Sequence, residues 1–236
     1  MSPRRGPDLP YSIVAGVTPW KAHWLVASAK MAGASFAPEE PRVFTSFAEI
    51  LSDSPAFAVI VVNAPIGYVE RPGLGVRTCD RQARALLGRR GATVHRSPTR
   101  TILEDDSNDR SENLDAVSAR LLPRYREVAA QMSPYRQRVV YEGHPELSFY
   151  QLNGDAPLKW SKNQEAGREE RRVLLEKKIP DVTKILDSTS GRVPAKHLMD
   201  SAALLWTARR VFGRAATRIP ADAEWDSEGL RIEMVL

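Results

Sequence analysis

Residues 57–67 read FAVIVVNAPIG, and this stretch predicts the centre of the fold. Its run at 58–62 is wholly apolar, which is typical of a central strand that other elements cover on both faces. The run ends in Asn63 and in a turn that contains proline and glycine. A polar side chain at the end of a buried strand lies at the rim of a sheet, where a rigid scaffold commonly exposes functional groups.

A second stretch, VVYEGHPELSF at 139–149, pairs naturally with the first. Its apolar strand leads directly into Glu142, His144 and Glu146, three side chains that can bind metals or move protons. The two stretches together predict neighbouring strands whose ends carry the chemistry of the protein.

Alternation and turn residues predict the remaining elements. We expect strands at 12–18, 21–28, 42–45, 138–141 and 230–235. We expect helices at 47–51, 78–87, 114–132, 145–152, 164–177, 179–186 and 195–213. Ser46 and Glu49 form a capping box for the first helix, and Pro123 is expected to kink or divide the third. Residues 91–112 read as a long irregular loop.

This order of elements predicts an α/β protein. An N-terminal β-meander followed by alternating strands and helices gives a mixed sheet with helices on both faces. The length of 236 residues fits a single domain at 11–236, preceded by a flexible tail at 1–10 that is rich in proline, glycine and arginine.

Composition excludes several classes of protein. The apolar runs are too short to cross a membrane, and the N-terminus has no apolar core of a signal peptide. One cysteine cannot form an internal disulfide, so we expect a cytoplasmic protein. The net charge of +5 is compatible with nucleic acid as a partner, and it is equally compatible with an ordinary solvated basic surface.

Seven short segments, in order, resemble the uncharacterised prokaryotic family that is described as predicted RNase H-like nucleases. They are 15–18 (AGVT), 63–67 (NAPIG), 79–84 (CDRQAR), 121–128 (LLPRYREV), 142–149 (EGHPELSF), 161–162 (SK) and 199–210 (MDSAALLWTARR). The resemblance extends over nearly the whole chain and implies an RNase H-like fold, in agreement with the predicted order of elements.

The resemblance also implies a site. Glu142, Glu146 and Asp200 are retained acids, whereas Thr18 and Asn63 stand where family members usually carry aspartates. It implies that Glu142, Asp200 and Asn63 hold Mg²⁺ or Mn²⁺, that Glu146 and His144 assist, and that Thr18 lines the same pocket. With two acids replaced by neutral residues, we expect the metal to be held weakly.

Simpler interpretations exist for each of these residues. Asp200 could be a surface aspartate, Glu142 or Glu146 could pair with Arg136 or Arg138, and His144 could cap the following helix. Three basic residues could bind an anionic substrate or could only be solvated and paired with acids: Arg81, Arg84 and Lys162.

Three functions therefore stay open at this level. The first is a metal-dependent nuclease or phosphodiesterase with a weakened metal site. The second is a catalytically decayed fold that acts as a nucleic-acid-binding or scaffolding module. The third is a pocket for a small anionic ligand. Oligomeric state cannot be read from the sequence.

Overall fold

The computed structural model describes residues 10–71, 73–105, 114–189 and 192–236. The predicted tail at 1–10 therefore lies outside the described residues, except for Pro10. Among the described helices, none combines the length and the apolar composition that a transmembrane span requires.

One mixed sheet forms the centre of the molecule. Its strands are β1 (Ser12–Trp20), β2 (His23–Ala32), β3 (Ser35–Pro38), β4 (Arg42–Phe44), β5 (Phe57–Val62) and β6 (Val140–Glu142). The strand order is β3-β2-β1-β5-β6, and β4 pairs with the N-terminal end of β2, whereas β3 pairs with its C-terminal end. The β1–β2 meander is antiparallel, whereas β1, β5 and β6 are parallel. Their carboxyl ends therefore meet at one edge of the sheet, as the sequence predicts.

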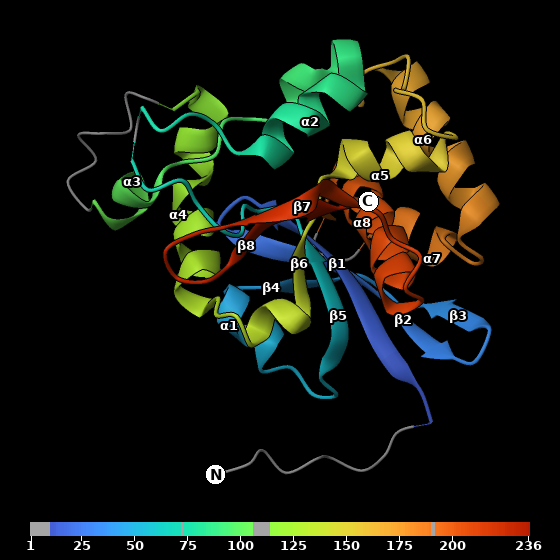
Figure 1. The fold of residues 1–236 in the computed structure, drawn as a ribbon. Helices are drawn as coiled ribbons and strands as arrows, with labels where there is room; N and C mark the ends of the chain where they lie inside the picture. The colour runs from blue at the N-terminus through green and yellow to red at the C-terminus, as the bar shows by residue number, and fades with distance from the viewer. Residues whose placement is uncertain (1–9, 72, 106–113, 190–191) are drawn as a thin grey trace.

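Helices cover both faces of this sheet (Figure 1). One face carries α5 (Pro145–Leu152), α6 (Glu165–Lys178), α7 (Thr183–Leu186) and α8 (Ala195–Phe212). The other carries α1 (Phe47–Leu51), α3 (Arg100–Glu104) and α4 (Ala116–Gln131). This α/β architecture confirms the predicted fold class and is consistent with an RNase H-like fold.

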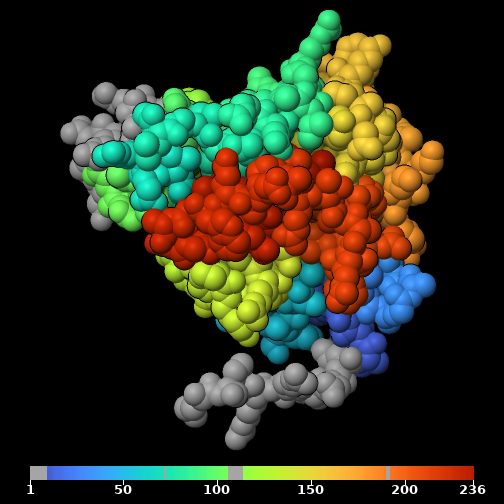
Figure 2. Space-filling view, in the orientation of Figure 1, coloured from blue at the N-terminus to red at the C-terminus, as the bar shows by residue number. Residues whose placement is uncertain are grey.

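A small hairpin of β7 (Arg218–Trp225) and β8 (Arg231–Val235) completes the fold. It packs with α2 (Thr78–Leu87) and α5 in a third apolar cluster. In the space-filling view the red C-terminal residues form a band between the green segment that contains α2 and the yellow-green segment that leads into β6 (Figure 2). A bridge from Gly143 to Val235 joins the hairpin to the end of β6.

The structure differs from the expected elements in four places. The helix expected at 179–186 is limited to α7, Thr183–Leu186, and residues 179–182 are not helical. The α4 helix continues through Pro123 without a break. The expected loop at 91–112 contains the end of a 3₁₀ helix, Gly88–Thr93, and the whole of α3, while its residues 106–112 lie outside the described part. Strands β3 and β7 were not expected. Strand β3 has four residues, too few to show a period, and the pairing of β7 with β8 shifts register between Ile219 and Glu224.

A candidate anion site at the end of β1

Gly16 fixes how α8 crosses the sheet. A Cβ atom at Gly16 would lie 2.2 Å from both the Leu205 nitrogen and the Ser201 oxygen, which are backbone atoms of the helix. Only a residue without a side chain permits this approach. The α8 helix therefore lies directly against β1, and residues of β1 with the same parity as Gly16 face the helix.

The helix runs antiparallel to β1, and this direction brings Asp200 toward Thr18. The Arg209 guanidinium lies over the Phe36 ring. Phe36 pairs with Met31 of β2, and Met31 pairs with Ser12 at the start of β1, so Arg209 lies near that end of β1. The first turns of α8 therefore lie at the opposite end of β1, where Thr18 faces the helix and is buried.

Asp200 forms an ion pair with Lys162 at this edge. The Lys162 Nζ lies 2.5 Å from Asp200 Oδ2. The two side chains differ in burial, because the aspartate is 5% exposed and the lysine is 31% exposed. Lys162 is therefore the outer member of the pair, and the solvent meets its positive charge rather than the carboxylate.

Two buried oxygens at this edge have no partner among the described residues, and one of them belongs to Asp200 itself. Within the described part of the chain, Thr18 Oγ1 and Asp200 Oδ1 are buried and make no hydrogen bond. A buried polar atom without a partner is costly, so such atoms commonly mark a position that a water, an ion or a ligand fills.

Asn63 belongs to the same edge. Its backbone N–H donates to the Val17 oxygen, which extends the pairing of β5 with β1 by one residue. Val59 and Val61 face α8, and the same alternation directs the half-buried Asn63 to that face. We call Thr18, Asn63, Lys162 and Asp200 the edge site.

Glu142 does not join the edge site. It pairs with Val62 in the sheet, and both residues have the parity of the opposite face. There its carboxylate accepts the Ile66 N–H at 2.7 Å and contacts both terminal nitrogens of Arg77, at 2.6 and 2.8 Å. The retained acids Glu142 and Asp200 thus lie on different faces of the sheet.

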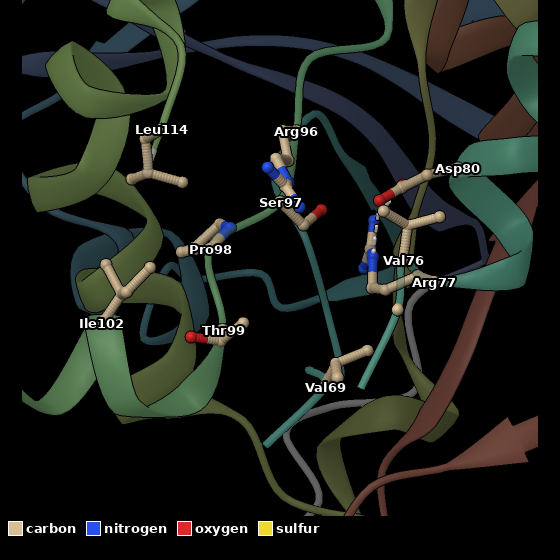
Figure 3. Close-up of a pocket in the computed structure, with 11 residues that line it drawn as sticks. Val69, Val76, Arg77, Asp80, Arg96, Ser97, Pro98, Thr99, Ile102 and Leu114 are labelled. Carbon is tan, nitrogen blue, oxygen red and sulfur yellow. Dashed lines mark hydrogen bonds and ion pairs between the residues drawn. The ribbon is translucent and has the colours of Figure 1, made fainter. Parts of the chain in front are cut away.

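Arg77 is the centre of a buried ion cluster. Its guanidinium also contacts both carboxylate oxygens of Asp80, at 2.6 and 3.1 Å, and donates to the backbone oxygens of Ile66 and Gly67. All three charged side chains are 3% exposed. We call Arg77, Asp80 and Glu142 the arginine cluster. Arg77 and Asp80 lie beside a cavity of about 60 Å³, which Val69, Arg96, Ser97 and Thr99 also line. Figure 3 shows these lining residues.

The arginine cluster contains two carboxylates for one guanidinium, so burial disfavours its fully ionised form. Burial raises the pKa of Glu142 to about 7, although Arg77 opposes the shift. A proton on Glu142 makes the cluster neutral. The same burial raises the pKa of the Cys79 thiol, so this cysteine stays protonated and is not a nucleophile.

This shift predicts a pH-dependent stability. Because the pKa of Glu142 rises from 4.5 in the unfolded chain to about 7 in the fold, its contribution to stability is complete below pH 4.5. It is lost as the pH rises to 7, and the loss amounts to as much as about 3 kcal/mol. We expect Glu142→Gln to remove this slope, which urea unfolding at pH 5 and pH 8 measures. Parallel slopes in the two proteins would contradict the shift, since other titrating groups cancel in the comparison.

The geometry does not fit a two-cation site. Among the described residues, Cys79, Asp80 and Glu142 are the one group of three metal-competent side chains that lie close together. The Arg77 guanidinium already bonds to both of its carboxylates. At the edge site, Asp200 is the single carboxylate, and Lys162 already neutralises it.

His144 and Glu146 have structural partners. His144 caps α5, because its Nδ1 accepts the Glu146 N–H at 3.2 Å and its Nε2 lies 3.1 Å from the Thr93 oxygen. Burial lowers the pKa of His144, so the ring is neutral and both nitrogens are used. The Glu146 carboxylate is buried between Arg171 at 2.6 Å and Arg90 at 3.1 Å. Of the open interpretations, capping for His144 and ion pairing for Glu146 are observed, although Arg136 and Arg138 are not the partners.

Arg81 and Arg84 lie on α2, and the bonds they make are to residues outside the edge site. The Arg84 Nε donates to the Val94 oxygen, and an Arg81 nitrogen lies 3.4 Å from Thr78 Oγ1. Arg77, one turn earlier, was not among the expected site residues. The signal was its position three residues before Asp80, but nothing in the local sequence links it to Glu142.

Comparison with known proteins identifies the family alone. The family model described as "Protein of unknown function (DUF429)" matches residues 16–225. No curated protein matches the chain, and no solved structure matches it. The matched segment runs from the glycine under α8 to the end of β7, and the chain belongs to this family of proteins of unknown function.

Proposed function

We propose that this protein binds nucleic acid through a backbone phosphate at the edge site, and that Lys162 is the residue that contacts the phosphate. The observation that carries the proposal is the Lys162–Asp200 pair, in which the lysine is the exposed partner. In place of several acids that repel a phosphodiester, the edge presents one ammonium group over one neutralised carboxylate. An ammonium group is a good partner for a phosphate.

The surroundings of the pair support a nucleic-acid ligand. Lys159 lies over the ring of Trp160, which is 42% exposed, and Lys21 lies over the ring of Trp20 at the end of β1. The Trp20 ring is half-buried, so Trp160 is the exposed ring of the two. An exposed aromatic ring beside basic residues is a usual means by which proteins stack the bases of a single strand.

The test is the binding of a labelled single-stranded oligonucleotide. Fluorescence anisotropy measures this binding at salt concentrations from low to moderate. Lys162→Gln should weaken binding similarly for every sequence and lower the salt slope by about 1, because one phosphate contact is lost. Lys177→Gln is the matched control, since it removes an exposed lysine near the end of α6. Equal binding by wild type and Lys162→Gln would overturn the proposal.

Asp200→Asn separates binding from metal-dependent cleavage. The substitution frees Lys162 from its partner, so we expect oligonucleotide binding that is unchanged or tighter. A metal-dependent nuclease would instead lose its activity with the same substitution. If the wild type cleaves the oligonucleotide with a metal and Asp200→Asn abolishes the cleavage, the protein is a nuclease and the binding proposal is wrong.

One observation favours a metal-dependent nuclease as the second candidate function. Thr18 Oγ1 and Asp200 Oδ1 are buried oxygens without partners, and oxygens of this kind suit Mg²⁺ or Mn²⁺. Thr18, Asn63 and Asp200 would hold a single ion, which would supply positive charge to a phosphodiester. Calorimetric titration with Mn²⁺ tests this function. Stoichiometric binding to the wild type that is lost in Asp200→Asn would support a metal-dependent nuclease. The absence of any heat of binding would count against it.

A further inference from the structure

A cavity lies at the other end of α8, away from Asp200. This cavity of about 470 Å³ opens between the start of the parallel strands, the end of α8 and the β7–β8 hairpin. Its volume is within the range of small-molecule sites. Val59, which lines it, precedes Asn63 of the edge site by four residues, or roughly 13 Å along the strand. The two sites are therefore separate.

The cavity combines an apolar interior with a basic mouth. Val59, Val235 and the Tyr141 ring line the interior, and Phe212, which is 40% exposed, stands at the opening. Arg214 and Arg218 are the charged residues of the lining.

The charges at this mouth are not balanced. Glu233 is the acid that Arg218 contacts, and it also pairs with Arg231. Arg218 also lies over the Tyr141 ring, with 5.5 Å from its Cζ to the ring centroid. Among the described residues, the guanidinium of Arg214 has neither a hydrogen-bond nor an ion-pair partner. An anion at the mouth would therefore meet an uncompensated positive charge.

Arg214 occupies a position that favours glycine. Its φ is +57°, in the left-handed region, where a side chain costs free energy. The turn is a helix C-terminus in which the Arg214 N–H donates to the Val211 oxygen and the Ala215 N–H donates to the Arg210 oxygen. Glycine is the common residue at this position of such a turn. An arginine held there against its backbone preference points to a use for its side chain.

We propose that this cavity binds a small organic anion with a flat apolar body, and that Arg214 contacts its anionic group. The apolar body enters between Val59, Tyr141 and Phe212, and the anionic group stays at the mouth. An arginine bonds such a group through charge-assisted hydrogen bonds, which are stronger than neutral ones.

Two fluorescent probes with the same rings test the proposal. The anionic probe is 8-anilinonaphthalene-1-sulfonate, and the neutral probe is N-phenyl-1-naphthylamine, which lacks the sulfonate. Wild type should bind the anionic probe with one-to-one stoichiometry. Arg214→Gly should weaken that binding about tenfold, the effect of losing one charged hydrogen bond, and should leave the neutral probe unaffected.

The melting temperature of Arg214→Gly serves as the folding control. Because glycine relieves the left-handed backbone, Arg214→Gly should raise the melting temperature in the absence of probe, so a loss of binding cannot be ascribed to unfolding. Phe212→Ala should weaken both probes, since it removes part of the apolar lining. Lys177→Ala, which removes a positive charge from the last turn of α6, should change neither.

Three results would overturn the proposal. They are no binding of the anionic probe to the wild type, equal weakening of both probes by Arg214→Gly, and unchanged binding of the anionic probe to Arg214→Gly.

Discussion

Replacing Arg77 with methionine should destabilise the protein by about 3–5 kcal/mol, because it leaves the carboxylates of Asp80 and Glu142 buried without their cation. Both carboxylates are 3% exposed, and the guanidinium bonds to both oxygens of each. Water cannot replace these bonds without opening the contact between α2 and the end of β6. Urea unfolding at pH 8, where Glu142 of the wild type is mostly ionised, should show the largest loss.

The companion variants separate charge from packing. Adding Asp80→Asn and Glu142→Gln to Arg77→Met removes the uncompensated charges, so stability should recover in part. Arg81→Met, one turn along α2, changes an exposed side chain and should alter stability by less than about 0.5 kcal/mol. An Arg77→Met protein as stable as the Arg81→Met control would show that the arginine cluster contributes nothing to the fold.

Gly16→Ala should destabilise the protein by about 3 kcal/mol, at the upper end of the range for overpacking. The added methyl group would lie 2.2 Å from backbone atoms of Leu205 and Ser201, and backbone cannot rotate away as a side chain can. The whole α8 helix must move from β1 for the methyl group to fit. Denaturant unfolding measures the loss of stability.

Gly213→Ala is the matched control. A Cβ at Gly213 would lie no closer than 3.4 Å to another atom, and the residue has a negative φ. Its stability should therefore stay near that of the wild type. If Gly16→Ala also behaves like the wild type, α8 does not lie against β1 as closely as the structure indicates.

The sequence by itself determined the sheet and most of its covering. The apolar run at 58–62 predicted the central strand, since a strand covered on both faces has no polar alternation. Ser46 and Glu49 predicted the start of α1, and the Ser46 side chain does accept the Glu49 N–H. These features are local: each depends on neighbours within one turn or one strand, so the order of residues is enough to reveal them.

Only the tertiary structure decided which residues form the edge site and which form the arginine cluster. Glu142 and Asp200 could be assigned to one edge from sequence, but not to one face, because side chains alternate and the pairing register with Val62 sets the face of Glu142. The partners Arg77 for Glu142 and Lys162 for Asp200 lie 65 and 38 residues away in the chain. Local sequence carries no record of such contacts, since they arise only when the packing of α2 and α8 against the sheet brings the charges together.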